Sequence, residues 1–338
     1  MRNPSGWEFL LTDNPSLYDL SIFQPDDELG MVLRPESTGT TRTPEFHTTV
    51  RINAHGVRGE ALPAKTTDEL RILAVGDSFT LGLQVGFQDT FAEQAAARLS
   101  ERLGHPVRIL NAGVDGFGTQ AASRLMQRLA TPLEVDAVLL TFFLGNDFWD
   151  NSHFEQVVSQ PPMVPQNQTR LSNSIGGFSA IYSYGKLAWS LRRMAANPDV
   201  AGRRRPELSV FNDKLALANQ VPATQAALAS FAVASEALGL PTYVVLAPPA
   251  YAVQTQRAAA TLELFGLDPE TLDLDAPAAA IVQVTPAEIP VLDLGPVLRT
   301  APDPGALYFT LDGHWTPQGH HIAASAISDF LYPLLNSR

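Results

Sequence analysis

Three residues that are far apart in the sequence could together perform nucleophilic chemistry: Ser78, Asp312 and His314. A serine hydroxyl is a weak nucleophile, so it needs a base within hydrogen-bond reach and a third group that orients the base. Asp312 precedes His314 by two residues, and in an extended segment such positions face the same way. A direct bond between two residues so close in sequence requires a bend at Gly313. Taken alone, the serine and the Asp-x-His pair are each more often structural, for example in a turn or a helix cap.

Acyl transfer also needs hydrogen-bond donors for the negative charge that develops on the carbonyl oxygen. A glycine-rich segment at 111–119 follows one predicted strand, and Asn146 follows another. Glycine allows a close backbone approach, and a side-chain amide can donate to the same oxygen. Each segment alone is ordinary turn chemistry. The combination indicates acyl transfer, because the ends of three adjacent parallel strands each carry a suitable group.

Four short blocks, in this order, resemble those of the SGNH (GDSL-like) hydrolase superfamily. They are Gly76-Asp77-Ser78, residues 111–118, Gly145-Asn146-Asp147 and Asp312-Gly313-His314. The likeness is close over residues 70–147 and 305–335 and extends to the architecture alone in between. It implies a three-layer α/β/α sandwich that is flavodoxin-like, with five parallel strands.

The resemblance also implies a role for each block. Ser78 would be the nucleophile and would donate to the oxyanion through its own N–H. Gly116 would be the second oxyanion donor through its backbone, and Asn146 the third through its amide. His314 would be the general base and Asp312 the residue that orients it.

The last block departs from the commonest pattern of the superfamily. That pattern is Asp-x-x-His, whereas here Asp312 and His314 are separated by one residue and Trp315 follows. An Asp-x-His-Trp segment resembles a branch that includes bacterial polysaccharide O-acetyltransferases. The acceptor of the acyl group, water or a sugar hydroxyl, therefore stays open. The side chains beside the four blocks that we expect to contact substrate are Asp77, Phe79, Phe148, Trp149 and Trp315.

The segments between these residues alternate between strand and helix patterns. Apolar runs predict parallel strands at 71–75, 107–110, 137–144, 241–246 and 290–294. Helical patterns lie between or after them at 89–103, 119–129, 225–238, 251–264 and, after an N-cap at Thr316, 317–335. This order predicts an α/β fold with helices on both faces of the sheet.

Two regions lie outside this alternation. Residues 1–68 predict a β-rich N-terminal appendage, with a hairpin at 41–52, and the α/β domain follows over 69–338. A long insertion at about 148–220, with an amphipathic segment at 181–194, leaves the third strand. We expect it to form a lid or an acyl-binding wall over the site; a peripheral excursion is the alternative.

The composition excludes several classes of function. With 35 acidic and 23 basic residues the net charge is −12, which argues against nucleic acid as a partner, and the lone basic cluster 203–205 is typical of a solvated loop. The chain has no cysteine. The longest apolar run, 137–145, is about half of a membrane span, and the first residues contain no secretory segment, so the chain as written is expected to be soluble and free of a membrane span. Localisation stays open, because a longer product could have lost an export or anchoring segment.

We expect no metal and no cofactor. His320 and His321 are adjacent, but neighbouring positions on a helix point about 100° apart and no third ligand is evident. Three functions remain. The first is a serine esterase for small acyl groups, such as acetyl on a carbohydrate. The second is an O-acyltransferase to a sugar hydroxyl, and the third is a non-catalytic carbohydrate-binding protein on the same fold. The sequence leaves the oligomeric state open.

Overall fold

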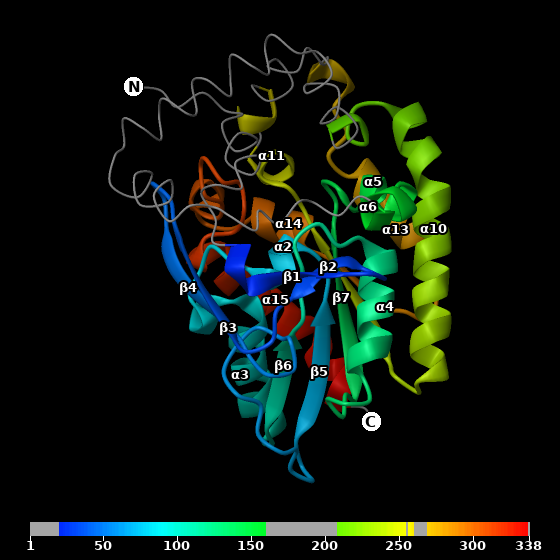
Figure 1. Ribbon diagram of the computed structural model, residues 1–338. Helices are drawn as coiled ribbons and strands as arrows, with labels where there is room; N and C mark the ends of the chain where they lie inside the picture. The colour runs from blue at the N-terminus through cyan, green and yellow to red at the C-terminus, as the bar shows by residue number, and fades with distance from the viewer. Residues whose placement is uncertain (1–19, 160–207, 255, 260–268, 337–338) are drawn as a thin grey trace.

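Five short apolar strands form one parallel sheet at the centre of the molecule. The computed structural model describes residues 20–159, 208–254, 256–259 and 269–336 (Figure 1). The strand order is β6-β5-β7-β8-β9, and every neighbouring pair is parallel. The strands are β5 (Leu70–Val75), β6 (Val107–Asn111), β7 (Ala137–Phe143), β8 (Thr242–Ala247) and β9 (Val291–Asp293). All five predicted strands are confirmed to within one residue at either end.

Both faces of the sheet are buried, which explains why its strands are apolar throughout. Along β5 the side chains alternate: Leu73 and Val75 belong to one hydrophobic cluster, and Ile72 and Ala74 to a second on the other face. The first cluster includes side chains of α4 (Thr119–Leu129), α10 (Lys214–Ala237) and α13 (Ala276–Val284). The second includes side chains of α3 (Phe91–Leu103), α14 (Leu294–Arg299) and α15 (Pro317–Asn336). The predicted three-layer α/β/α fold is confirmed, with α4 and α10 on one side and α3 and α15 on the other (Figure 1).

Several short elements lie between these strands and helices. Three helices stand at the carboxyl ends of strands: α2 (Ser78–Leu81), α5 (Asp147–Ser152) and α11 (Ala250–Val253). The helix α6 (Phe154–Ser159) follows α5. Single 3-10 turns are η2 (Leu20–Ile22), η3 (Phe87–Asp89), η4 (Pro269–Thr271) and η5 (Pro304–Ala306). No helix among these residues has the length and hydropathy to cross a membrane.

Two helix predictions need correction, and one helix was missed. The helix predicted at 225–238 begins at Lys214 instead, where Asp213 caps it, and it continues through Pro222. The helix predicted at 251–264 is interrupted: α11 ends at Val253, Gln254 is extended with φ −99° and ψ 90°, and residues 256–259 are helical again. The helix α13 was not predicted at all. It begins after Asp275 with a proline in its first turn, which is a favourable start.

The N-terminal segment contributes two antiparallel hairpins. They are β1 (Phe23–Asp26) with β2 (Gly30–Leu33), and β3 (Ser37–Arg42) with β4 (His47–Ile52). The second is the hairpin predicted at 41–52. Apolar side chains of both hairpins belong to the same hydrophobic cluster as α4 and α10. The division of the chain at residue 68 stays a prediction. Of the insertion at 148–220, residues 160–207 lie outside the described part, so its predicted lid and the amphipathic segment at 181–194 also stay predictions.

Candidate active site

Ser78 lies at the carboxyl end of the central strand β5, as the first residue of α2. Gly76 makes this turn possible: its φ is 150°, and a Cβ there would lie 2.5 Å from the carbonyl oxygen of Thr141 on the neighbouring strand β7. Asp77 caps the helix, because its carboxylate accepts the N–H of Phe79 at 2.9 Å. The turn therefore presents the Ser78 hydroxyl at the edge of the sheet, where the side chain is only half-buried.

A chain of hydrogen bonds joins the three residues that the sequence singled out. The Ser78 Oγ lies 2.7 Å from His314 Nε2, and His314 Nδ1 lies 2.7 Å from Asp312 Oδ1. Gly313 has a φ of 87° and provides the bend that brings Asp312 against its neighbour. Because a carboxylate only accepts, Nδ1 carries the imidazole proton, and Nε2 accepts from the serine hydroxyl. This is the arrangement that a serine nucleophile needs.

The charges around His314 favour its role as a base that takes up a proton. Burial lowers the pKa of His314, but the carboxylate of Asp312 raises it by charge and by its hydrogen bond, and Asp77 and Asp115 raise it further. The net pKa lies above the usual value for a histidine. The imidazolium that forms when Ser78 loses its proton is therefore stabilised.

The two other oxyanion candidates lie at the ends of the strands that flank β5. Gly116 belongs to the loop after β6, has a φ of 74° and is exposed to solvent. Asn146 precedes α5 at the end of β7 and is half-buried, and its amide nitrogen donates to the Asp150 carboxylate. A primary amide has two N–H groups, so one remains for a ligand. The strand order β6-β5-β7 thus places Gly116, Ser78 and Asn146 on three adjacent strand ends.

Not all of the predicted substrate-contacting residues lie at the surface of the site. The ring centroid of Phe79 lies 4.8 Å from that of the His314 imidazole. The Trp315 ring contacts Phe79 edge-on, with 5.0 Å between the ring centroids. Both are buried, as is Asp77, so they support the site from below. Phe148 has no exposed surface and packs on Phe142 in the core, which corrects its expected place beside the substrate. Trp149 is half-buried and stacks on His153 at 4.2 Å.

Two buried carboxyl groups, Asp77 and Asp147, lie beneath the strand ends. Asp147 accepts the N–H of Phe143 at 3.0 Å through one oxygen. Its other oxygen, like the second oxygen of Asp77, has no hydrogen-bond partner among the described residues. Burial raises the pKa of both groups, and the charge of Asp77 raises the pKa of Asp147 further. The pair therefore retains a proton at a pH where exposed aspartates are ionised.

The two adjacent histidines of α15 have separate environments. His320 is buried, and its Nδ1 accepts the N–H of Phe91 at 3.2 Å. Burial and the nearby charge of Arg58 lower the pKa of His320 to about 3, so it is neutral. His321 is exposed and bonds to Gln94 at 2.8 Å.

Sequence reasoning missed two residues of the N-terminal segment that touch the site. The carboxylate of Glu45 accepts the N–H groups of Leu311 and Asp312, each at 2.9 Å. The buried guanidinium of Arg58 donates to the carbonyls of Leu81 and Gly82 at the end of α2. Burial lowers the pKa of Arg58 to about 10, which leaves it charged at neutral pH. No local pattern marks either residue, because their partners are distant in sequence.

A doubly wound parallel sheet with a hydrogen-bonded serine, histidine and aspartate at its carboxyl edge is the arrangement of a serine-type hydrolase. A model of the GDSL-like Lipase/Acylhydrolase family matches residues 74–322, and the chain belongs to this family. Family membership makes the protein an acyl hydrolase in the general sense, and the SGNH resemblance of the four blocks is confirmed.

Several solved structures are similar in fold. The lipase Lip_vut3 from a goat rumen metagenome has 13% identity and a TM-score of 0.44, over 78% of this chain and 98% of that chain. TesA has 15% identity and a TM-score of 0.41, over 78% of this chain and 99% of that chain. A catalytic mutant of Axe2, an acetylxylan esterase from Geobacillus stearothermophilus, has 11% identity and a TM-score of 0.41. The match covers 78% of this chain and 94% of that chain. A search of curated proteins finds no match.

Proposed function

We propose that this protein hydrolyses carboxylic esters of small acyl groups through a covalent acyl-enzyme on Ser78. The observation that carries the proposal is the hydrogen-bond chain from the Ser78 hydroxyl through both nitrogens of His314 to Asp312, with 2.7 Å at each step. Family membership supports hydrolysis of an acyl group, and the hydrogen-bond chain supports serine as the nucleophile.

In the first half of the proposed cycle, Ser78 Oγ attacks the ester carbonyl carbon while His314 Nε2 takes the hydroxyl proton. The carbonyl oxygen becomes an oxyanion that accepts from the N–H groups of Ser78 and Gly116 and from the Asn146 amide. The tetrahedral intermediate then collapses and breaks the bond to the alcohol oxygen. His314 returns its proton to that oxygen, and the alcohol leaves.

In the second half, water takes the place of the alcohol. His314 accepts a proton from the water, whose oxygen attacks the acyl carbon, and the same donors hold the second oxyanion. The intermediate releases the carboxylic acid, and the proton returns from His314 to Ser78 Oγ. The carboxylate of Asp312 remains ionised and stabilises the imidazolium in both halves. The cycle is balanced without a cofactor.

A fluorophosphonate probe tests the proposal, because it reacts with an activated serine and leaves a stable mass adduct. The probe is expected to label the wild-type protein on Ser78 and to leave Ser78→Ala unlabelled. Ser209→Ala, at a half-buried serine shortly before α10, is the matched control and is expected to be labelled like wild type. Folded wild-type protein that neither reacts with the probe nor hydrolyses any ester would contradict the proposal and favour a carbohydrate-binding protein.

The second candidate function is transfer of the same acyl group to a sugar hydroxyl. The Asp312-Gly313-His314-Trp315 segment favours it, because it resembles the last block of polysaccharide O-acetyltransferases. The two functions differ only in what attacks the acyl-enzyme. Incubation with p-nitrophenyl acetate and a panel of oligosaccharides separates them: a hydrolase releases acetate at the same rate with or without sugar, whereas a transferase forms O-acetylated sugar in preference to acetate.

A further inference from the structure

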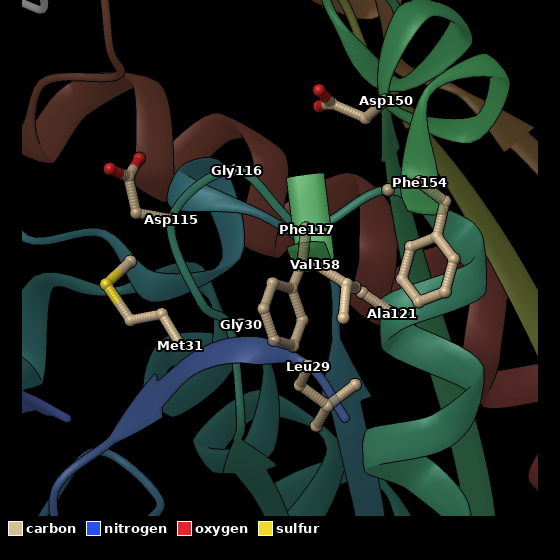
Figure 2. A pocket seen from close by; sticks show the side chains of 11 residues that line it. Leu29, Gly30, Met31, Asp115, Gly116, Phe117, Ala121, Asp150, Phe154 and Val158 are labelled. Atoms are coloured by element: carbon tan, nitrogen blue, oxygen red, sulfur yellow. The ribbon is translucent and has the colours of Figure 1, made fainter. Parts of the chain in front are cut away.

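A small recess lies beside the candidate oxyanion donors and has no role in the bond-making steps described above. Its volume is about 60 Å³. Six apolar side chains line it, and Figure 2 shows them below two carboxylates. These six are Leu29, Met31, Phe117, Ala121, Phe154 and Val158. All except Val158 are buried, so the apolar end is an enclosed hollow with little open surface.

The recess adjoins one oxyanion candidate directly and a second through a hydrogen bond. Gly116 is itself part of the lining. On the opposite side the lining includes Asp150, which accepts the hydrogen bond from the Asn146 amide. Asp115, the third polar lining residue, lies near enough to His314 for its charge to raise the pKa of the imidazole. An apolar space therefore lies next to the position that a carbonyl group bound by Gly116 and Asn146 would take.

The walls of the recess are held in place by charged groups that lie outside it. The β1–β2 hairpin supplies Leu29 and Met31, and α4 supplies Ala121. Arg128 of α4 bonds to Asp26 of the hairpin at 2.6 Å and lowers the pKa of that carboxyl. Arg128 also bonds to Glu28 at 3.1 Å. These bonds fix the hairpin on the helix, so the hollow has a defined size.

We infer that this recess binds the acyl group of the substrate and that it accepts short, neutral acyl chains of about two to four carbons. The inference rests on the proposed function, since it assigns a substrate class to the same site. The 60 Å³ volume of the recess is several times the roughly 10–15 Å³ that a single water requires, which is room for a short chain and not for a long one. Burial of each methylene in an apolar hollow favours binding until the space is filled, after which the next carbon clashes. Asp115 and Asp150 at the rim disfavour an acyl group that ends in a carboxylate.

The test varies the acyl chain while the alcohol stays constant. The p-nitrophenyl esters of acetate, butyrate, hexanoate and octanoate are compared by kcat/KM, together with the hemisuccinate. Wild type is expected to hydrolyse acetate and butyrate, and to be about 10-fold or more slower on hexanoate, octanoate and hemisuccinate, as is usual when a pocket discriminates by one or two carbons.

Two variants change the size of the recess in opposite directions. Ala121→Leu fills the recess and is expected to lower kcat/KM for the butyrate ester, relative to that for the acetate ester, by about 10-fold or more. Phe154→Ala enlarges the recess and is expected to raise kcat/KM for the hexanoate ester, relative to that for the acetate ester, by about 10-fold. The matched controls are Ala97→Leu, at an exposed position of α3, and Phe330→Ala, at a half-buried position of α15. Both should keep the wild-type dependence on chain length. If Ala121→Leu fails to fold, the chain-length dependence of Phe154→Ala alone tests the inference.

The outcomes separate this inference from the proposed function. Loss of fluorophosphonate labelling and of all ester hydrolysis in folded wild type would end both. The acyl-binding role of the recess alone would be overturned if Ala121→Leu and Phe154→Ala are labelled normally and depend on acyl chain length as wild type does. A second series, acetyl esters of phenol, ethanol and a methyl glycoside, checks the other occupant: if the variants change the preference for the alcohol and leave the acyl preference intact, the recess binds the alcohol and the inference is wrong.

Discussion

The carboxylate of Glu45 accepts the backbone N–H of Asp312 at 2.9 Å, across 267 residues of sequence. Glu45 lies in the turn between β3 and β4, and it accepts the N–H of Leu311 as well. Next to it, Phe46 packs on Phe309 with 5.1 Å between ring centroids. The tip of an N-terminal hairpin therefore holds the loop that presents the candidate acid and base.

This contact predicts that Glu45 is a positioning residue. Glu45→Ala removes the acceptor of two N–H groups and should lower kcat by about 10-fold, because a small displacement of the base reduces catalysis strongly, while KM changes little. Glu45→Gln keeps an acceptor oxygen and should retain most of the activity. Glu101→Ala, at an exposed position of α3, is the control. Equal kcat for Glu45→Ala and Glu101→Ala would show that the contact is not needed for positioning.

The raised pKa of His314 predicts the pH dependence of the reaction. The imidazole must be neutral to act as a base, so kcat/KM should rise with pH through a midpoint above the usual histidine value. Asp312→Asn removes the main group that raises this pKa, so the midpoint should move to lower pH. The plateau should fall on the order of 10²- to 10⁴-fold, since the tautomer is no longer fixed. Asp27→Asn, at an exposed position, should leave the pH–rate profile unchanged.

The amide of Asn146 is predicted to stabilise the transition state more than the bound ester. Asn146→Ala should lower kcat by about 10²-fold or more with a small change in KM, because the missing donor acts on the oxyanion. Asp150→Asn removes only the carboxylate that the amide bonds to, and a milder loss is expected. Steady-state kinetics with p-nitrophenyl acetate measures both. A loss confined to KM in Asn146→Ala would exclude an oxyanion role.

The buried pair of Asp77 and Asp147 predicts a pH-dependent stability. A carboxyl whose pKa is raised on folding binds more protons in the folded state than in the unfolded state between its two pKa values. Stability is therefore lost as pH rises from the usual aspartate range through the raised pKa values. Asp147→Asn removes one of the two charges and should raise Tm relative to wild type at pH 8, with a smaller difference at pH 5.

Thermal unfolding of Asp147→Asn at the two pH values checks this expectation. Asp68→Asn, at an exposed position, provides the matched control, and its Tm should equal that of wild type at both pH values. A stabilisation of Asp147→Asn that is the same at pH 5 and pH 8 would show that shape, and not charge, is responsible.

The strands and the nucleophile turn were predictable because local rules determine them. A strand covered on both faces must be apolar at every position, and a turn as tight as the one at Gly76 accepts only glycine. The proximity of Ser78, His314 and Asp312 was likewise predictable from residue types and spacing, since a nucleophilic serine restricts those types severely, and their catalytic roles stay a prediction.

The remaining features depend on tertiary contacts that carry no local pattern. Glu45 in a hairpin turn has the same sequence signature as any solvated turn residue. Pro222 normally argues against a helix, yet α10 continues through it, packed against α4 and α5. Phe148 follows Asn146 closely in sequence, but the helical turn of α5 directs its ring into the core and away from the site. Its burial could be learned only from the folded chain.

The contacts of Glu45 and Arg58 bear on how this enzyme could be shortened or recombined. A polypeptide starting at residue 69 would keep all four blocks of the family, yet it would leave the carbonyls that end α2 and the amides of Leu311 and Asp312 without their charged partners. It would also uncover apolar side chains of the hydrophobic cluster that the hairpins share with α4 and α10. Grafting the catalytic unit onto another protein therefore requires that the N-terminal segment through Arg58 be transplanted with it.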